Sequence, residues 1–266
     1  MFRLDHILKE NLIASYVVEE GIPCFSPKSE IETAYDKYES IENNIDFYTW
    51  LVYGHRPERN VYARVNDLLH EYLKSDGSSI ILDVGCGVGR TIYDIAEKYR
   101  ETHFIGFDYS LNMLQRSKQI LIEGGKLLVD LSSSGFQDFD LKCKKLNNVH
   151  LVQGSVNELP FKPNSFDVLV NTFLIDRVEN VRSAIEQMAL VLKPGGLFVL
   201  ASPLNFQTRE NWKYGQTETL VELIKSQGIE IVKSEGGIPH KEVLDARGNF
   251  KMWQTLIIWG RKSNPL

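Results

Sequence analysis

The stretch Ile81-Leu-Asp-Val-Gly-Cys-Gly-Val-Gly89 decides the fold. Residues 81–84 form a short apolar run, every second residue from Gly85 to Gly89 is glycine, and a helical stretch opens at about Arg90. A strand that turns through glycines into a helix brings its backbone close to a ligand at the point where a Cβ would collide. The stretch therefore predicts a ligand-binding loop between a buried strand and a helix.

The spacing of the glycines narrows the class of ligand. A dinucleotide fingerprint places its third glycine where this chain has Arg90, so pyrophosphate binding is disfavoured. Asp108 closes the next apolar run, residues 104–107. A carboxylate at the end of that strand accepts hydrogen bonds from both hydroxyls of a ribose. Together the loop and the acid predict a site for an adenosine-containing ligand.

Short apolar runs alternate with helical stretches along the rest of the chain, which is typical of βα units around a parallel sheet buried on both faces. We expect seven strands. The interval 124–150 is longer than the roughly 2–6 residues of an ordinary αβ connection and predicts a local insertion. The expected strands lie at 80–84, 104–107, 150–153, 166–170, 197–201, 229–232 and 254–259.

Residues 1–60 differ from the rest because their aromatic residues lie among acids and amides, without the Val and Ile runs of buried strands. They predict a helical cap over a Rossmann-like domain at 61–266. The apolar positions of 61–70 follow the spacing of one buried helix face and predict the last helix before the sheet.

Charge and cysteine content exclude several classes of protein. The chain has 30 Lys and Arg against 35 Asp and Glu, so it has no general attraction for nucleic acid or anionic lipid. No apolar run reaches the roughly 18 residues of a membrane span, and we expect a cytoplasmic protein without membrane contact. Cys24, Cys86 and Cys143 form no CxxC pair, which disfavours both a disulfide framework and a metal site.

Five segments, in order, carry a resemblance: 82–89, 106–114, 154–161, 165–170 and 191–199. They resemble the motifs of class I S-adenosylmethionine-dependent methyltransferases, over about residues 60–262. The order matters because a glycine-rich turn with a downstream acid occurs in many nucleotide-binding folds. The resemblance implies an α/β fold with a seven-stranded, mostly parallel, doubly wound sheet, its last strand antiparallel and helices on both faces. It also implies S-adenosylmethionine as the cofactor.

The resemblance assigns a role to each expected cofactor residue. The set is Asp83, Gly85, Cys86 and Gly87 around the glycine loop, Asp108 at the ribose, Tyr109 and Met113 beside the adenine, Ser155 and Val156 at its amino group, and the backbone of Asn171 and Thr172 at the methionine amine. Ser155 stands where the family commonly has an acid, so Asn157 or the backbone is an alternative contact for the adenine amino group. Asp83 and Met113 also fit plain structural roles, as a turn cap and a core residue.

The acceptor site is expected above the carboxyl ends of the strands, under the N-terminal segment. The catalytic candidates are Tyr53, His55, Asp176 and Arg177. His55 is a candidate base, and the Asp176–Arg177 pair follows the fourth strand, where many small-molecule methyltransferases carry a His pair; a surface ion pair is the alternative interpretation. Further candidates for the rim are Tyr35, Tyr38, Tyr48, Arg56, Arg59, Arg209, Trp212, Tyr214, His240 and Arg247.

The sequence thus predicts a methyltransferase of the EC 2.1.1 class that methylates an oxygen or nitrogen, a carboxylate included, of a small molecule or short peptide. After the fourth strand the chain reads Asn171-Thr-Phe-Leu174, not the Asn/Asp-Pro-Pro-Tyr/Phe used for adenine or glutamine amino groups. The alternatives are an RNA or protein methyltransferase, a non-catalytic cofactor-binding subunit and a nucleotide-dependent oxidoreductase. The retained glycines and Asp108 argue against a degenerate subunit. No oligomeric state is predicted.

Overall fold

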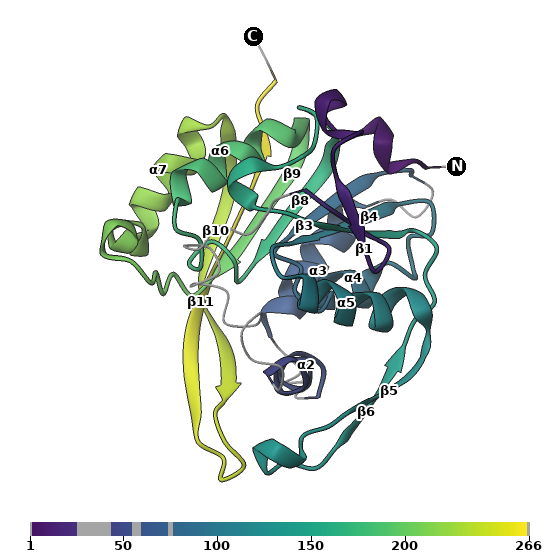
Figure 1. Cartoon of the computed structure of the whole chain (residues 1–266). Helices are drawn as coiled ribbons and strands as arrows, with labels where there is room; N and C mark the ends of the chain where they lie inside the picture. The colour runs from purple at the N-terminus through teal and green to yellow at the C-terminus, as the bar shows by residue number, and fades with distance from the viewer. Residues whose placement is uncertain (1, 26–43, 55–59, 74–76, 265–266) are drawn as a thin grey trace.

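The structure, a computed structural model, describes residues 2–25, 44–54, 60–73 and 77–264 (Figure 1). A large mixed sheet with helices on both faces forms the body of the molecule. The expectations for Tyr35, Tyr38, His55, Arg56 and Arg59 lie outside the described residues. Within the described residues, no helix is long and apolar enough to cross a membrane.

The large sheet contains all seven expected strands. Its strands, in sheet order, are β1 (Val17–Glu19), β2 (Ile22–Cys24), β7 (Val149–Gln153), β4 (His103–Asp108), β3 (Ile80–Val84), β8 (Phe166–Thr172), β9 (Leu192–Ser202), β11 (Phe250–Lys262) and β10 (Ile229–Val243). From β7 to β9 neighbouring strands are parallel, and β11 pairs antiparallel with both β9 and β10. The mostly parallel sheet with an antiparallel last strand is therefore confirmed.

The expected count of seven strands is wrong, because four short strands are added to them among the described residues. β1 and β2 form a hairpin in the N-terminal segment, and β5 (Gly125–Val129) pairs with β6 (Phe139–Cys143) inside the insertion. The two turn residues of the first hairpin, Glu20 and Gly21, both have positive φ, as a tight two-residue turn requires. The described part of the N-terminal segment is thus not wholly helical. Three-residue strands with every side chain of β1 exposed leave too little periodicity to detect.

Helices cover both faces of the sheet, as a doubly wound fold requires. α3 (Val61–Tyr72), α4 (Arg90–Ile95) and α5 (Leu111–Lys118) pack on the face that carries Ile81. α6 (Val181–Val191) and α7 (Thr217–Ser226) pack on the face that carries Leu82. The remaining helical segments are η1 (Leu4–His6), η2 (Glu10–Leu12), α2 (Asn44–Tyr53), η3 (Gln119–Glu123), η4 (Ser132–Ser134), η5 (Val156–Glu158) and η6 (Arg209–Gly215).

The predicted helix before the sheet, α3, shows why its residues fold this way. The Asn60 side chain accepts a hydrogen bond from the Ala63 N–H at 2.9 Å and caps the helix. Val61, Val65 and Leu69 are fully buried along one stripe of the helix. That stripe fixes α3 on the sheet.

Two projections extend from the same end of the sheet and flank α2 (Figure 1). Beyond the pairs that β11 makes with β9, residues 238–243 and 250–255 pair only with each other, and we call residues 238–255 the hairpin arm. The β5–β6 hairpin is the second projection. The two approach each other, since a Cβ built on Gly135 would lie 3.6 Å from the Cβ of Ala246 in the arm. This arrangement places α2 between the two projections.

α2 is fixed to the body of the molecule by charge and by aromatic packing. Asp46 pairs with Arg116 of α5 at 2.6 Å. The Trp50 ring lies 4.4 Å from that of Phe136, which follows η4 in the insertion. The insertion therefore helps to hold the helix that covers the site described below.

Candidate active site

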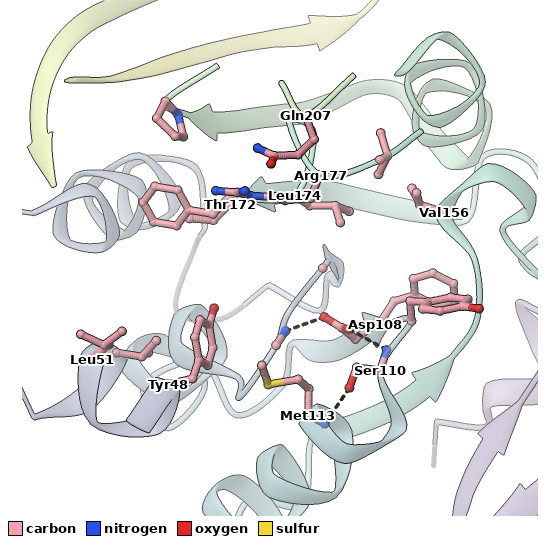
Figure 2. A pocket seen from close by; sticks show the side chains of 18 of the residues that line it. Tyr48, Leu51, Asp108, Ser110, Met113, Val156, Thr172, Leu174, Arg177 and Gln207 are labelled. Atoms are coloured by element: carbon pink, nitrogen blue, oxygen red, sulfur yellow. Dashed lines mark hydrogen bonds between the residues drawn. The ribbon is translucent and has the colours of Figure 1, made fainter. Parts of the chain in front are cut away.

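A cavity of about 770 Å³ opens at the carboxyl ends of the parallel strands, under α2 and the hairpin arm. Figure 2 shows Tyr48, Asp108 and Met113 on one side of it and Thr172, Arg177 and Gln207 on the other. We call the part lined by Gly85, Gly87, Asp108, Tyr109, Ser110, Met113, Gly154, Ser155, Val156 and Asn157 the cofactor half. The part lined by Tyr62, Phe173, Leu174, Arg177, Val178, Glu179, Pro203, Gln207, His240, Lys241, Glu242 and Trp253 is the acceptor half.

The glycine loop forms the floor of the cofactor half. The N–H groups of Gly85 and Cys86 both donate to the carbonyl of Phe107, at 2.7 and 3.1 Å, which draws the loop over the end of β4. Gly85 and Gly87 have φ of +75° and +52°. A Cβ at Gly85 would lie 2.7 Å from that of Leu174, and one at Gly87 would approach the Tyr48 hydroxyl at 3.5 Å. Glycine is therefore required by backbone conformation at both positions and by space at Gly85.

Asp108 joins this loop to the next strand (Figure 2). Its Oδ2 accepts a hydrogen bond from the Gly87 N–H at 2.7 Å, and its Oδ1 accepts one from the Ser110 N–H at 2.9 Å. The Ser110 hydroxyl in turn accepts from the Met113 N–H at 3.2 Å and caps α5. A carboxylate offers about four acceptor positions, so these bonds are compatible with hydrogen bonds to the hydroxyls of a ribose.

Asp83 lies beneath the loop and does not line the cavity. Its side chain is buried, and burial together with the nearby charge of Asp108 raises the pKa of its carboxyl from 3.8 to about 7. The carboxyl is thus poised to lose its proton near neutral pH. A positive charge placed near the loop would favour the ionised form.

The expected adenine contacts line one wall of the cavity together. Tyr109 follows β4, Met113 lies in the first turn of α5, and Ser155 and Val156 follow β7. The Ser155 hydroxyl accepts a hydrogen bond from the Asn157 N–H at 3.3 Å and caps η5. Asn157 also lines the cavity, so both alternatives for the adenine amino group, Ser155 and Asn157, lie on the same wall.

Besides Asp83, two more of the expected cofactor residues, Cys86 and Asn171, lie behind the cavity wall. Cys86 is buried, and its sulfur lies so close to Gly106 that a Cβ built on that glycine would be 3.0 Å away. Burial raises the pKa of the Cys86 thiol well above its ordinary value. The thiol therefore stays protonated and unreactive. Asn171 is also fully buried, and its side-chain amide donates to the Val84 carbonyl at 3.5 Å. Its neighbour Thr172 does line the cavity.

Of the four catalytic candidates, the structure brings Arg177 to the cavity. Its side chain is 47% exposed and lies 3.7 Å from the carboxylate of Asp176. Asp176 itself is buried, accepts a hydrogen bond from the Ser202 hydroxyl at 2.9 Å and does not line the cavity. Tyr53 is buried as well; its hydroxyl donates to the Val88 carbonyl at 3.0 Å and ties α2 to the loop. His55 lies outside the described residues.

Some of the other described rim candidates line the cavity, and others do not. Tyr48 and His240 line the cavity. Trp212 is 60% exposed, with the Arg209 guanidinium over its ring, while Tyr214 is buried against Phe206. The candidates Arg209, Trp212, Tyr214 and Arg247 are not part of the cavity wall.

Several residues of the acceptor half carry no signal in the sequence. Phe173 has a positive φ of 63°, and its ring lies 5.8 Å from Tyr62 and 4.5 Å from His240. One sequence feature does bear on the part of β10 that lines the cavity. It is the pair Gly236-Gly237 inside an otherwise regular strand, because glycine in a strand often marks a bulge. The strand register does shift there, between Glu235 and Ile238.

Metal ligands are not assembled anywhere in the described ranges, where no three His, Cys, Asp or Glu side chains group as a metal site would.

Comparison with known proteins gives the family. Residues 75–237 match the methyltransferase-domain family. Demethylmenaquinone methyltransferase of Oceanobacillus iheyensis is 31% identical over 172 residues, which cover 63% of this chain and 58% of that protein. The Staphylococcus haemolyticus enzyme of the same name is 27% identical over 177 residues, covering 65% of this chain and 60% of that protein. The matches thus span less than two thirds of these relatives.

Solved structures agree with the fold. A SAM-dependent methyltransferase from Methanosarcina mazei has a TM-score of 0.51 at 20% identity, over 74% of this chain and 98% of that one. A [4+2]-cyclase has a TM-score of 0.52 at 17% identity, over 76% of this chain and 81% of that one. The second likeness shows that one fold hosts different reactions, so the fold alone does not determine the chemistry of the site.

The methyltransferase-domain match covers more than half of the chain and includes the glycine loop, Asp108, Ser155 and Arg177. The resemblance noted in the sequence is confirmed: the chain belongs to the class I methyltransferase-domain family, whose cofactor is S-adenosylmethionine.

Proposed function

We propose that the protein transfers a methyl group from S-adenosylmethionine to an oxygen or nitrogen of a small molecule bound in the acceptor half of the cavity. The observation that carries the proposal is that one cavity is lined by two different sets of residues. One part has a glycine loop and an acid suited to a nucleoside, and the other has aromatic and polar side chains suited to a second ligand.

The cofactor half fits the cofactor on three grounds. Gly87 leaves space that a side chain would otherwise occupy, below Tyr48. Asp108, the expected ribose contact, lines the cavity. The Oδ1 of Asn157 and the Oγ1 of Thr172 are buried without a hydrogen-bond partner among the described residues, and a polar ligand would supply partners.

When bound, the cofactor supplies a methyl group on a positively charged sulfur. The protein's own contribution is to fix the two ligands against each other, and well-oriented reactants gain as much as about 7–11 kcal/mol from proximity. Asp108 and the glycine loop hold one ligand, and the acceptor half holds the other. Tyr48 and Leu51 of α2 line the side of the cavity next to both halves (Figure 2).

The size and cover of the cavity support a small acceptor over a macromolecule. Its volume lies in the range of about 300–1,000 Å³ typical of small-molecule sites. The relatives' name, demethylmenaquinone methyltransferase, also refers to a small-molecule acceptor. Of the described arginines considered for a carboxylate acceptor, Arg177 lines the cavity, whereas Arg209 packs on Trp212 outside the cavity wall. A hydroxyl or amine is the acceptor group that we propose. Cytoplasmic location stays a prediction.

The test is transfer of isotope-labelled methyl from S-adenosylmethionine into a cell extract, which is then separated into small-molecule, peptide, protein and RNA fractions. Asp108→Asn is the variant with weakened cofactor binding, and it is tested at limiting cofactor. Asp167→Asn is its matched control, because Asp167 binds the Ile80 N–H and Lys193, both at 2.8 Å, and does not line the cavity.

We expect label in the small-molecule fraction with the wild type and with Asp167→Asn, and far less label with Asp108→Asn. Label in RNA or protein alone would overturn the acceptor class. Absence of label in every fraction, despite measurable cofactor binding, would overturn methyl transfer and favour a non-catalytic subunit.

A further inference from the structure

We propose that His240, carried over the cavity by the hairpin arm, accepts the proton from the hydroxyl group of a planar aromatic acceptor that binds against Phe173. This inference rests on the proposed methyl transfer. It adds the class of acceptor and the residue that handles its proton, and no motif of the cofactor half bears on either.

His240 lies in the wall of the acceptor half beside a strained aromatic residue. Its ring is 4.5 Å from that of Phe173, and both residues line the cavity. Phe173 holds a backbone conformation that bulky residues rarely adopt, with φ of +63°, and its N–H donates to the Ala201 carbonyl at 2.8 Å. Strain of this kind persists where the surroundings impose it, often at functional sites. Here it presents the Phe173 ring to the cavity.

A bulge in β10 precedes His240 and directs this part of the strand toward the acceptor half of the cavity. Glu235 pairs with Ile257 and Ile238 pairs with Thr255, so Gly236 and Gly237 together oppose a single residue of β11. Gly237 has φ of +75°, which favours glycine. Bulges bend a strand and redirect its side chains, and they are common beside active sites. The arm therefore leaves the plane of the sheet at the bulge and extends over the cavity.

The strand register pairs His240 with Trp253 across the arm. Directly opposed residues of antiparallel strands face the same side, and both residues line the cavity. The indole N–H of Trp253 donates to the carboxylate of Glu242 at 2.7 Å. The face of the arm over the cavity thus presents an imidazole and an indole, which together with Phe173 and Tyr62 suit a flat aromatic ligand.

The imidazole of His240 is in a suitable state to accept a proton. Burial lowers its pKa below the ordinary 6.5, and the nearby charge of Glu242 opposes that shift. His240 is therefore neutral at pH 7, and its ring makes no hydrogen bond to another described residue. The other charged or titratable groups that face this half of the cavity are Lys241 on the arm, Tyr62 on α3, and Arg177 and Glu179 after β8.

The proton has to leave because a neutral hydroxyl is a weak nucleophile. As the new bond forms between the acceptor oxygen and the methyl carbon, the bond from that carbon to the cationic sulfur breaks, its electron pair stays on sulfur as a neutral thioether, and the hydroxyl proton passes to a ring nitrogen of His240. The imidazolium then returns its proton to water when the products leave.

The test compares two phenols of similar size and different acidity as methyl acceptors at pH 8. 4-Methylphenol has the hydroxyl of a tyrosine side chain, which ionises at about pH 10, and needs a base. 4-Nitrophenol is far more acidic, is largely ionised at pH 8 and needs none. The variant is His240→Asn. The matched control is His6→Asn, because His6 is exposed on η1 and outside the cavity wall.

We expect the wild type and His6→Asn to methylate both phenols. His240→Asn should lose transfer to 4-methylphenol by about 100-fold or more, in the usual range for removal of a general base, and keep transfer to 4-nitrophenol within a few-fold. Added imidazole should restore part of the lost transfer in His240→Gly. In NMR titrations of the wild type, the His240 ring should titrate below pH 6.5 and shift when 4-methylphenol is added.

Each other outcome overturns the inference in a different way. An equal loss for both phenols would make His240 a structural residue of the arm. If neither phenol binds or is methylated while label still enters the small-molecule fraction of an extract, the aromatic acceptor is wrong and the proposed function stands. If label enters no fraction, the proposed function fails together with this inference.

Discussion

The carboxylate of Asp108 accepts a hydrogen bond from the backbone N–H of Gly87 at 2.7 Å. Asp108 therefore braces the glycine loop as well as lining the cavity. Asp108→Ala leaves that N–H without its partner and should lower the free energy of unfolding by about 1–3 kcal/mol. Asp108→Asn keeps an oxygen acceptor and should lose less. Urea denaturation without cofactor measures both, and equal stability of the alanine variant and the wild type would contradict the brace.

Gly85 and Gly195 share a φ of +75° and differ in their surroundings. A Cβ at Gly195 would meet nothing within 4 Å, whereas one at Gly85 would lie 2.7 Å from that of Leu174. Gly195→Ala should cost only the conformational strain, about 1–2 kcal/mol. Gly85→Ala should cost about 1–3 kcal/mol more from overpacking, and should weaken cofactor binding. Thermal unfolding of the two variants checks this, and the same loss in both would refute the steric argument.

Asp83 should link cofactor binding to pH. The pKa of its carboxyl is raised to about 7, first by burial and then by Asp108, so the free protein holds a proton there below that pH. A cationic ligand favours the ionised carboxylate, so affinity should rise about tenfold from pH 6 to pH 8 as the proton is released. Calorimetry in buffers of different ionisation enthalpy measures that proton. Asp83→Asn should abolish its release and Asp167→Asn should not; a release unchanged in Asp83→Asn would assign the proton to another group.

His150, near the amino end of β7, should make the free energy of unfolding depend on pH. Burial, and then the charge of His103, lower the pKa of His150 from 6.5 to about 4, and Phe2 packs 4.8 Å from its ring. The unfolded chain takes up a proton below pH 6.5 that the folded chain refuses until about pH 4. Stability should therefore fall over that interval, by about 1–3 kcal/mol after allowance for solvent screening. His150→Leu should flatten this part of the stability profile, and an unchanged slope would contradict the assignment.

The central strands and the cofactor half could be predicted from the sequence because each rests on a local pattern. Buried parallel strands are continuous apolar runs, and the loop from Gly85 to Gly89 encodes its own turn. Asp108 follows from its place at the end of a strand. The hairpin β1–β2 could not be predicted, because its two strands have three residues each and every side chain of β1 is exposed. In β5–β6 only the five residues of β6 alternate between apolar and charged, which is too short a pattern to define a strand by itself.

The acceptor half was harder to predict because it depends on contacts distant in sequence. The Oδ1 of Asp176 accepts a hydrogen bond from the Ser202 hydroxyl, and the Tyr53 hydroxyl donates to the Val88 carbonyl, so neither side chain is part of the cavity wall. His240 reaches the cavity through the bulge at 236–237, which no periodicity reveals. Residues of α2 line the cavity, while the helical cap at residues 1–60 and the division of the chain at residue 60 stay predictions.

The most direct measurement of the central claim is calorimetric binding of S-adenosylmethionine to the wild type, Asp108→Asn and Asp167→Asn. We expect one site per chain in the wild type and an unchanged affinity in Asp167→Asn. Asp108→Asn should bind about 10–100-fold more weakly, because charge-assisted hydrogen bonds to the ribose are lost. Equal affinity of all three proteins, or no binding to the wild type, would contradict the assignment of this cavity to the cofactor.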